Sequence, residues 1–207
     1  MKLTDIPVVF ICPDHNEKYK KRKEYMFKFL ADIGFKDISM FKSGTEKYPL
    51  CLAQAVYDVL QTRLDDKPFI LLEDDIELSQ WVESFDVDIP EDADAFYLGF
   101  GKYAGHPTEP RAIGYNSVLV EHISDKHIRV INMLGFHAIM FITERFKRVT
   151  VDIMKHILEE ENILTQDLGV SRVQKLYNIY AYKYPFFYQS EHMGNNWYAM
   201  DATNFRF

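Results

Sequence analysis

Three consecutive acids, Glu73, Asp74 and Asp75, directly follow the apolar run 68–72. That run shows no polar alternation, which is typical of a strand buried on both faces at the centre of a mostly parallel sheet. In open α/β sheets, ligands bind at the carboxyl ends of the strands. Because residues two apart on a strand project to the same side, Glu73 and Asp75 are expected to face one ligand, while Asp74 points elsewhere or caps the following turn.

The chemistry that suits these acids is the binding of a hard cation. Carboxylate oxygens are preferred ligands of Mg²⁺ and Mn²⁺. A metal held by only one or two protein ligands keeps positions open for other oxygens, such as those of a diphosphate. The alternative is a solvated acidic turn, which the long apolar run before it disfavours. The remaining acids downstream are assigned to an exposed loop without function: Glu83, Asp86, Asp88, Glu91 and Asp92.

The first half of the chain supplies the elements that would position such a site. Apolar runs read as strands, and apolar residues recurring every three or four positions read as helices. Gly34 is a helix stop signal. The order is strand, helix, strand, helix, strand, at 8–12, 17–33, 37–41, 50–64 and 68–72. This alternation predicts an α/β domain.

The second half is less regular, and its tail 189–207 has no periodicity. Strands are expected at 95–100, 117–121, 128–132, 134–143 and 179–184, helices at 145–160 and 166–175, and a loop at 102–115. No internal repeat or linker interrupts the chain. We therefore expect a single domain over 1–207.

Several segments together resemble glycosyltransferase family 25, which includes lipooligosaccharide and procollagen galactosyltransferases. The resemblance rests on the opening strand 8–11, the basic segment 20–26, the helix 50–64, the Glu-Asp-Asp strand end at 73–75, Leu134-Gly135-Phe136-His137-Ala138 and Thr165-Gln166-Asp167-Leu168. Tyr48-Pro49-Leu50-Cys51 departs from the small-residue and Ser-His pattern that usually opens the second helix of the family. A distant relative of viral or bacterial origin fits this pattern.

The resemblance implies a GT-A type fold, with a Rossmann-like mixed sheet flanked by helices. It implies a metal-dependent glycosyltransferase that moves a sugar, with inversion, from a nucleotide-diphosphate donor such as a UDP-sugar to a hydroxyl of a glycan or glycoprotein. Residues 1–100 would bind the donor and 101–207 the acceptor. The chemistry agrees, since Mn²⁺ or Mg²⁺ neutralises a leaving diphosphate and inversion needs a base near the acceptor hydroxyl.

The donor side of the expected site lies at the acidic triplet and the first strand. We assign the metal to Asp75 with Glu73 and His192, and nucleotide-sugar contacts to Pro13, His15, Arg22, Glu73 and Asp74. Two alternatives stay open. His192 is equally a surface histidine, and the basic segment that contains Arg22 is equally a solvated helix face.

Asp167 is the candidate base on the acceptor side, because an acid at a helix start has its charge favoured there and can face the cleft. A plain first-turn acid is the alternative, and Asp94 and Asp152 are weaker candidates. Acceptor contacts are assigned to four residues with flat rings: Tyr103, Tyr115, His137 and Trp197. His137 is equally a core residue.

Composition excludes several classes. The 207 residues carry a net charge of −7, which disfavours a protein that coats nucleic acid. Two cysteines, Cys12 and Cys51, are too few for a disulfide scaffold and are expected to be reduced. Neither a spanning segment nor a signal peptide is evident, so we expect a cytoplasmic protein, in the host if viral.

Two rival functions come from other classes. A metal-dependent nucleotidyltransferase or phosphotransferase also uses paired acids at a strand end. The sequence contains no glycine-rich phosphate loop of the P-loop type, which weakens that reading. A non-catalytic nucleotide-sugar-binding module is the third possibility.

Overall fold

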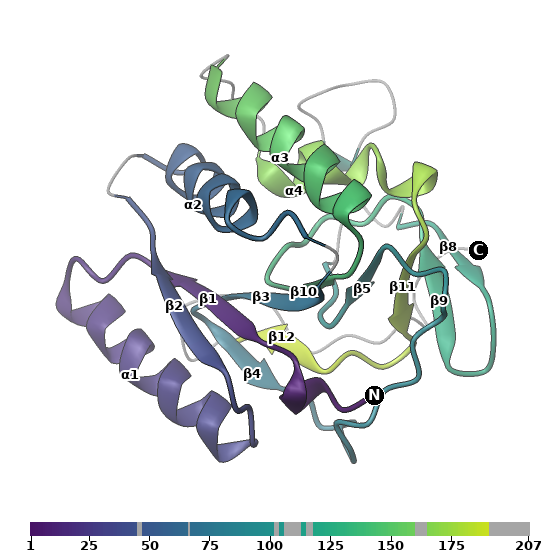
Figure 1. Ribbon diagram of the computed structural model, residues 1–207, viewed down its shortest axis with the longest axis horizontal. Coiled ribbons are helices and arrows are strands. Elements are labelled where there is room, and N and C mark those ends of the chain that lie inside the picture. Colours follow the sequence, from purple (N-terminus) through teal and green to yellow (C-terminus); the bar gives the residue numbers. More distant parts are fainter. Residues whose placement is uncertain are drawn as a thin grey trace.

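The computed structural model describes residues 1–44, 47–65, 67–101, 118–159 and 165–190, together with the backbone of 104–105 and 113–114. An eight-stranded mixed sheet forms its centre (Figure 1). In spatial order its strands are β2 (Ile38–Lys42), β1 (Val8–Cys12), β3 (Phe69–Glu73), β10 (Ala138–Phe141), β5 (Ala95–Tyr97), β11 (Ile179–Tyr182), β9 (His127–Val130) and β8 (Val120–His122).

Six of these strands share one direction, and β10 and β9 run the opposite way. β1 pairs in parallel with β2 and β3, and β5 pairs in parallel with β11. β10 runs antiparallel between β3 and β5, and β8 and β9 form an antiparallel hairpin at the edge. The predicted α/β class is thus confirmed. The expectation that β3 lies among parallel strands holds only on its β1 side.

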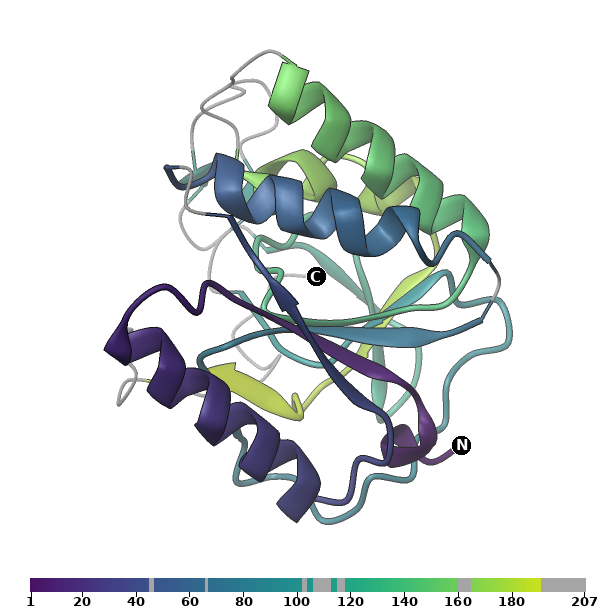
Figure 2. The same cartoon turned by 60° about the vertical axis from the view of Figure 1, so that its left-hand side comes forward.

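Helices cover both faces of the sheet. Figures 1 and 2 show α1 (Glu17–Asp32) on one face, and α2 (Leu50–Gln61), α3 (Glu144–Glu159) and the short α4 (Gln166–Ser171) on the other. Strands β1 and β3 carry apolar residues at every position except Glu73, so both of their faces are apolar. Helices on both sides of the sheet are therefore needed to bury them. Val9, Ile11, Phe69 and Leu71 pack in the cluster with α2 and α3, while Val8, Phe10, Ile70 and Leu72 pack in the cluster with α1.

The remaining elements are short. They are two 3-10 turns, Leu3–Asp5 and Gln174–Leu176, the backbone pair β6 (Ala104–Gly105) and β7 (Ile113–Gly114), and the pair β4 (Ile76–Leu78) and β12 (Phe187–Gln189). No sequence pattern predicts β4 or β12, because three residues are too few to show an alternation. No helix of the described residues is long and apolar enough to cross a membrane.

Asp94 joins three elements at the start of β5. Its side chain is only 1% exposed and accepts hydrogen bonds from Arg145 Nε (2.5 Å), Thr143 Oγ1 (2.6 Å) and the Asn178 backbone N (2.9 Å). Burial alone would raise the pKa of the Asp94 carboxyl, but these hydrogen bonds outweigh it, and the pKa lies below its ordinary value. Asp94, a weaker candidate for the base, is therefore a structural residue.

Replacing Asp94 tests that role. Asp94→Asn should lower the free energy of unfolding by about 2 kcal/mol at neutral pH, the scale of hydrogen bonds to a charged group. Because the folded-state pKa is depressed, this contribution is complete above the ordinary carboxyl pKa and is lost as the pH falls through the folded-state value. Urea denaturation measured from acid to neutral pH checks this. The exposed Glu91→Gln should unfold like the wild type, and equal midpoints for both variants at neutral pH would contradict the assignment.

Candidate functional site

The carboxyl ends of β1 and β3 lie side by side and bring two parts of the expected donor site together. Ile11 is in register with Glu73, so Pro13 follows β1 at the level where the acidic triplet follows β3. Pro13 is half-buried, and His15 is exposed with its ring 4.9 Å from that of Tyr19. This strand edge is where a ligand of an α/β sheet is expected.

Glu73 lies on the α4 side of β3, in a cluster of carboxylates. Burial raises the pKa of Glu73 well above its ordinary value, and the charges of Asp75, Asp167 and Asp74 raise it further. The hydrogen bond from Gln189 Nε2, at 3.0 Å, opposes this effect only in part. The fold has therefore concentrated negative charge around Glu73 from the β3–β4 turn and from α4.

Asp74 points to the opposite face, as its position next to Glu73 requires. Arg22 NH1 of α1 donates to Asp74 Oδ1 at 2.9 Å and lies 3.5 Å from Asp75 Oδ2. All three side chains are buried, with 6% to 7% of each residue exposed.

Burial, with the nearby charge of Asp74, raises the pKa of the Cys12 thiol to about 12, so Cys12 stays protonated. Cys12 and Cys51 are both free, as expected.

The interpretation of the whole basic segment as a solvated helix face is wrong for Arg22. The exposed residues Lys18, Lys20 and Lys21 do form a solvated helix face, but Arg22 is not part of it. Its guanidinium is turned inward and occupied by the acidic turn. Arg22 thus binds Asp74 and Asp75 and holds their carboxylates in place. A direct contact of Arg22 with a nucleotide stays a prediction.

Asp167 lies in the first turn of α4, where the sequence predicts it. Its Oδ1 accepts hydrogen bonds from Thr165 Oγ1 and from the backbone N of Leu168, the latter at 2.8 Å. The charge of Asp167 acts on Glu73 and on Tyr48. Desolvation of its hydroxyl, together with the charges of Asp167 and Glu73, raises the pKa of Tyr48 to about 12, although 60% of the residue is exposed. Asp167 therefore faces the carboxylate cluster, whereas Asp152, the other weaker candidate, is exposed on α3.

His137 lies just before β10 and is only 3% exposed. Burial lowers the pKa of His137 to about 4, against the opposing effects of the Asp75 charge and of the nearby Phe187 backbone. The imidazole lies against Gly99, where a Cβ would stand 2.2 Å from Nε2. His137 is thus a neutral core residue at the floor of the site, and an acceptor contact by it stays a prediction.

Four sequence-predicted site residues lie outside the described residues: His192, Tyr103, Tyr115 and Trp197. Two other aromatic residues of the second half, Tyr97 and Phe100, are buried in the core and offer no platform for a sugar. Tyr97 instead accepts a hydrogen bond from Gln174 Nε2 at 2.9 Å.

Sequence reasoning missed Tyr48 and Gln189 as neighbours of Glu73. Gln189 belongs to the tail without periodicity, so no sequence signal marked it. Tyr48 stands at the start of the second helix, where the chain departs from the pattern of glycosyltransferase family 25. That departure is the one sequence feature that could have singled it out.

The donor set fits a hard cation held by few protein ligands. Among the described residues, no group of three or more His, Cys, Asp or Glu side chains is placed to hold a metal ion. Glu73 and Asp75 nevertheless offer carboxylate oxygens in a cluster whose mutual repulsion raises the pKa of Glu73, and a divalent cation would relieve that repulsion. Asp74 is engaged by Arg22.

Comparisons with known proteins show remote structural likeness only. No family model matches the chain and no curated protein matches it, so membership of glycosyltransferase family 25 is not confirmed. A nucleoside-diphosphate-sugar pyrophosphorylase from Vibrio cholerae RC9 is similar at 13% identity and TM-score 0.46, over 86% of this chain and 73% of that one.

Two further structures are similar at 9% identity. One is a glycosyltransferase involved in glycosylation of the major capsid of PBCV-1, with TM-score 0.47 over 78% of this chain and 71% of that one. The other is the CTP:phosphocholine cytidylyltransferase of Streptococcus pneumoniae, with TM-score 0.45 over 90% and 94%. At this level of similarity, no activity transfers to this chain, and its function has to be argued from its own residues.

The buried pairing of Arg22 yields a prediction. Arg22→Ala should lower the free energy of unfolding by about 3–5 kcal/mol, because it leaves buried carboxylates without their counter-charge. Chemical denaturation measures the loss, and the exposed neighbour Lys21→Ala should cost almost nothing. Adding Asp74→Asn to Arg22→Ala should cost less than the sum of the two single changes. Strict additivity would show that the pair is not coupled.

Proposed function

We propose that this protein is a metal-dependent, inverting glycosyltransferase that transfers a sugar from a nucleotide-diphosphate donor, a UDP-sugar in the first instance, to a hydroxyl of a glycan or glycoprotein. The observation that supports this most is the convergence of Glu73, Asp75 and Asp167 at one edge of the sheet. These carboxylates come from two elements far apart in the sequence. Their collected charge suits a cation, a diphosphate bound to it and a base on the acceptor side.

On the donor side, Glu73 and Asp75 would hold Mn²⁺ or Mg²⁺. When bound, this cation supplies charge neutralisation to the leaving diphosphate. Arg22 keeps Asp75 and Asp74 in place by its ion pairs with both. The loop that begins at Pro13 and His15 lies at the same strand edge, and we assign the nucleoside to it.

On the acceptor side, Asp167 would take the proton of the attacking hydroxyl. Thr165 and the Leu168 backbone N bind its Oδ1 and so orient the carboxylate. We assign the second oxygen, Oδ2, to the proton. A base across the sugar from the leaving diphosphate is what a single inverting displacement requires.

The donor assignment predicts a loss of binding. Asp75→Asn and Glu73→Gln should each weaken Mn²⁺-dependent binding of UDP by about 10- to 100-fold, because each removes a charged oxygen worth about 1.5–3 kcal/mol. Isothermal titration calorimetry with and without Mn²⁺ measures this. The exposed Asp152→Asn is the matched control and should bind as the wild type does. Wild-type affinity in both site variants would refute the assignment.

The base assignment predicts a loss of turnover instead. Asp167→Asn should lower the rate of UDP release from UDP-sugars, with water as the acceptor, by about 10²–10⁴-fold, the usual size of general-base catalysis. It should also remove the acidic limb of the pH–rate profile and leave UDP affinity unchanged.

The products of the same assay separate the rival function. Release of a nucleoside diphosphate indicates sugar transfer, whereas release of pyrophosphate from a nucleoside triphosphate indicates nucleotidyl transfer. UDP-, GDP- and dTDP-sugars are tested in parallel. Near-normal turnover of Asp167→Asn would exclude Asp167 as the base, and a loss of UDP binding would place it on the donor side.

A further inference from the structure

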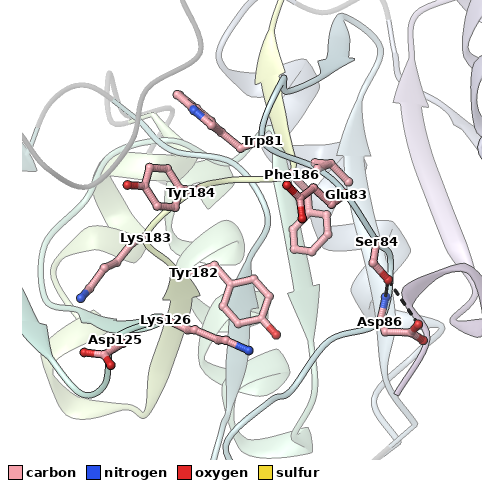
Figure 3. Close-up of a pocket in the computed structure, with 11 residues that line it drawn as sticks. Trp81, Glu83, Ser84, Asp86, Asp125, Lys126, Tyr182, Lys183, Tyr184 and Phe186 are labelled. Atoms are coloured by element: carbon pink, nitrogen blue, oxygen red, sulfur yellow. Dashed lines mark hydrogen bonds between the residues drawn. The ribbon is translucent and has the colours of Figure 1, made fainter.

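A pocket of about 340 Å³ lies on the α1 side of the sheet, and none of the acids of the carboxylate cluster lines it. Its volume is in the range of small-ligand sites, roughly 300–1,000 Å³. Residues of three segments line it: 81–84 and Asp86 after β4, Asp125 and Lys126 in the turn between β8 and β9, and 182–184 with Phe186 at the end of β11 and just beyond it. Figure 3 shows their side chains around the pocket.

Aromatic rings form the apolar part of this pocket. The ring of Trp81 lies 5.5 Å from that of Tyr184, and the ring of Tyr182 lies 5.8 Å from that of Phe186. The Tyr182 hydroxyl is held by the backbone N of Asp88 at 2.6 Å, which keeps its ring in position. Tyr184 is 49% exposed, so its ring is accessible to a ligand in the pocket. The rings thus form a preformed platform that is open to solvent.

Charged side chains of both signs flank the rings. Figure 3 shows Asp125, Lys126 and Lys183 on one side, and Glu83, Ser84 and Asp86 on the other. Within the described part of the chain, no ion pair engages the side chains of Asp125, Lys126, Lys183 or Glu83. The three acids and two lysines leave the pocket close to neutral but slightly acidic. A slightly acidic rim disfavours the binding of phosphates and nucleic acid. It suits a neutral ligand with many hydroxyl groups, because hydroxyls donate hydrogen bonds to carboxylates and accept them from ammonium groups.

A two-stranded ribbon connects this pocket to the acidic cluster. β4 and β12 pair, with Leu78 opposite Phe187 and Ile76 opposite Gln189. At one end Phe186 lines the pocket, and at the other Gln189 Nε2 donates to Glu73. Phe186 and Gln189 are three residues apart, which corresponds to about 10 Å of extended chain.

Ser79 secures the pocket end of the ribbon. Its backbone N donates to the Phe186 carbonyl at 2.8 Å, and its Oγ donates to the Pro185 carbonyl at 2.5 Å. The spacing of the pocket from Glu73 is therefore fixed by backbone hydrogen bonds. A ligand that occupied the pocket would lie at a set distance from the reacting centre.

We propose that the pocket bounded by Trp81, Tyr182, Tyr184, Lys126 and Lys183 is a saccharide-binding subsite that holds a neutral pyranose unit of the acceptor. The aromatic faces pack against the C–H face of the sugar ring, and the charged rim binds its hydroxyls. The identity of the ligand as a saccharide follows from the pocket. Its identity as part of the acceptor rests on the proposed function.

Tryptophan fluorescence tests the subsite directly. The chain has two tryptophans, so Trp197→Phe leaves Trp81 as the sole reporter. Methyl glycosides of glucose, galactose, mannose and N-acetylglucosamine, and the disaccharides lactose, maltose and chitobiose, are titrated at millimolar concentrations. We expect at least one to change the Trp81 emission in a saturable way. The apparent Kd should rise about tenfold in Tyr184→Ala, the scale of a lost aromatic contact.

Controls separate the outcomes. Leu176→Ala, which trims a leucine that is 68% exposed and outside the pocket, should keep the wild-type Kd. Asp75→Asn should also keep it, since the acidic cluster is a different site. The subsite is refuted if no probe gives a saturable change, or if the Kd is the same in Tyr184→Ala as in Leu176→Ala.

The two proposals fail in distinguishable ways. If saccharides bind at Trp81 but no nucleotide sugar is turned over, the subsite stands and the glycosyltransferase assignment falls. If nucleotide sugars are turned over but no probe perturbs Trp81, the reverse holds.

Discussion

The buried contact between Arg22 and the acidic turn is the interaction on which the site depends. Three adjacent acids at the end of an apolar strand repel one another, and Asp74 and Asp75 are almost fully buried. One guanidinium from the first turns of α1 reaches both. Because burying a charge without a partner is costly, α1 and the β3–β4 turn have to form together. The ion pairs therefore fix the position of the acidic turn relative to α1.

The alternation of side chains along β3 then divides the acids between two tasks. Asp74 continues the face of Ile70 and Leu72 and meets α1, while Glu73 continues the face of Phe69 and Leu71 and meets α4. The first carboxylate is structural, and the second joins Asp167 in the carboxylate cluster. A single residue of strand register thus separates a carboxylate that holds the fold from one that is available for chemistry.

The β4–β12 ribbon links the cluster to the rest of the chain. Gln189 donates to Glu73, and Ser190 donates to the backbone carbonyl of Asp75. Glu77 accepts from Tyr188 Oη at 2.7 Å and from Ser190 Oγ at 2.5 Å. This late segment therefore stabilises the turn that carries the acids. The same ribbon carries Phe186 into the aromatic pocket, so the geometry of both sites has a common support.

The local elements and the position of the acids at a strand end could be predicted from the sequence. The runs 8–12 and 68–72 predicted buried strands, the apolar spacing predicted α1, α2 and α3, and the strand-helix order predicted the α/β class. These features are visible because periodicity reflects which faces a segment buries. Strand alternation also predicted that Asp74 would point away from Glu73 and Asp75. Asp74 does turn to Arg22, but Asp75 lies 3.5 Å from the same guanidinium, because both residues belong to the turn after β3.

Which distant residues meet at the site could not be predicted, because it depends on how the elements pack. Arg22 looks like its neighbours Lys20 and Lys21 in the sequence, yet the helix face that turns inward makes it the buried partner of Asp74. β12 is too short for a pattern, so its Gln189 and the aromatic residues before it carried no signal. Proximity between residues far apart in the chain depends on the packing of whole elements, and a linear pattern records only what each segment buries, not what it is buried against.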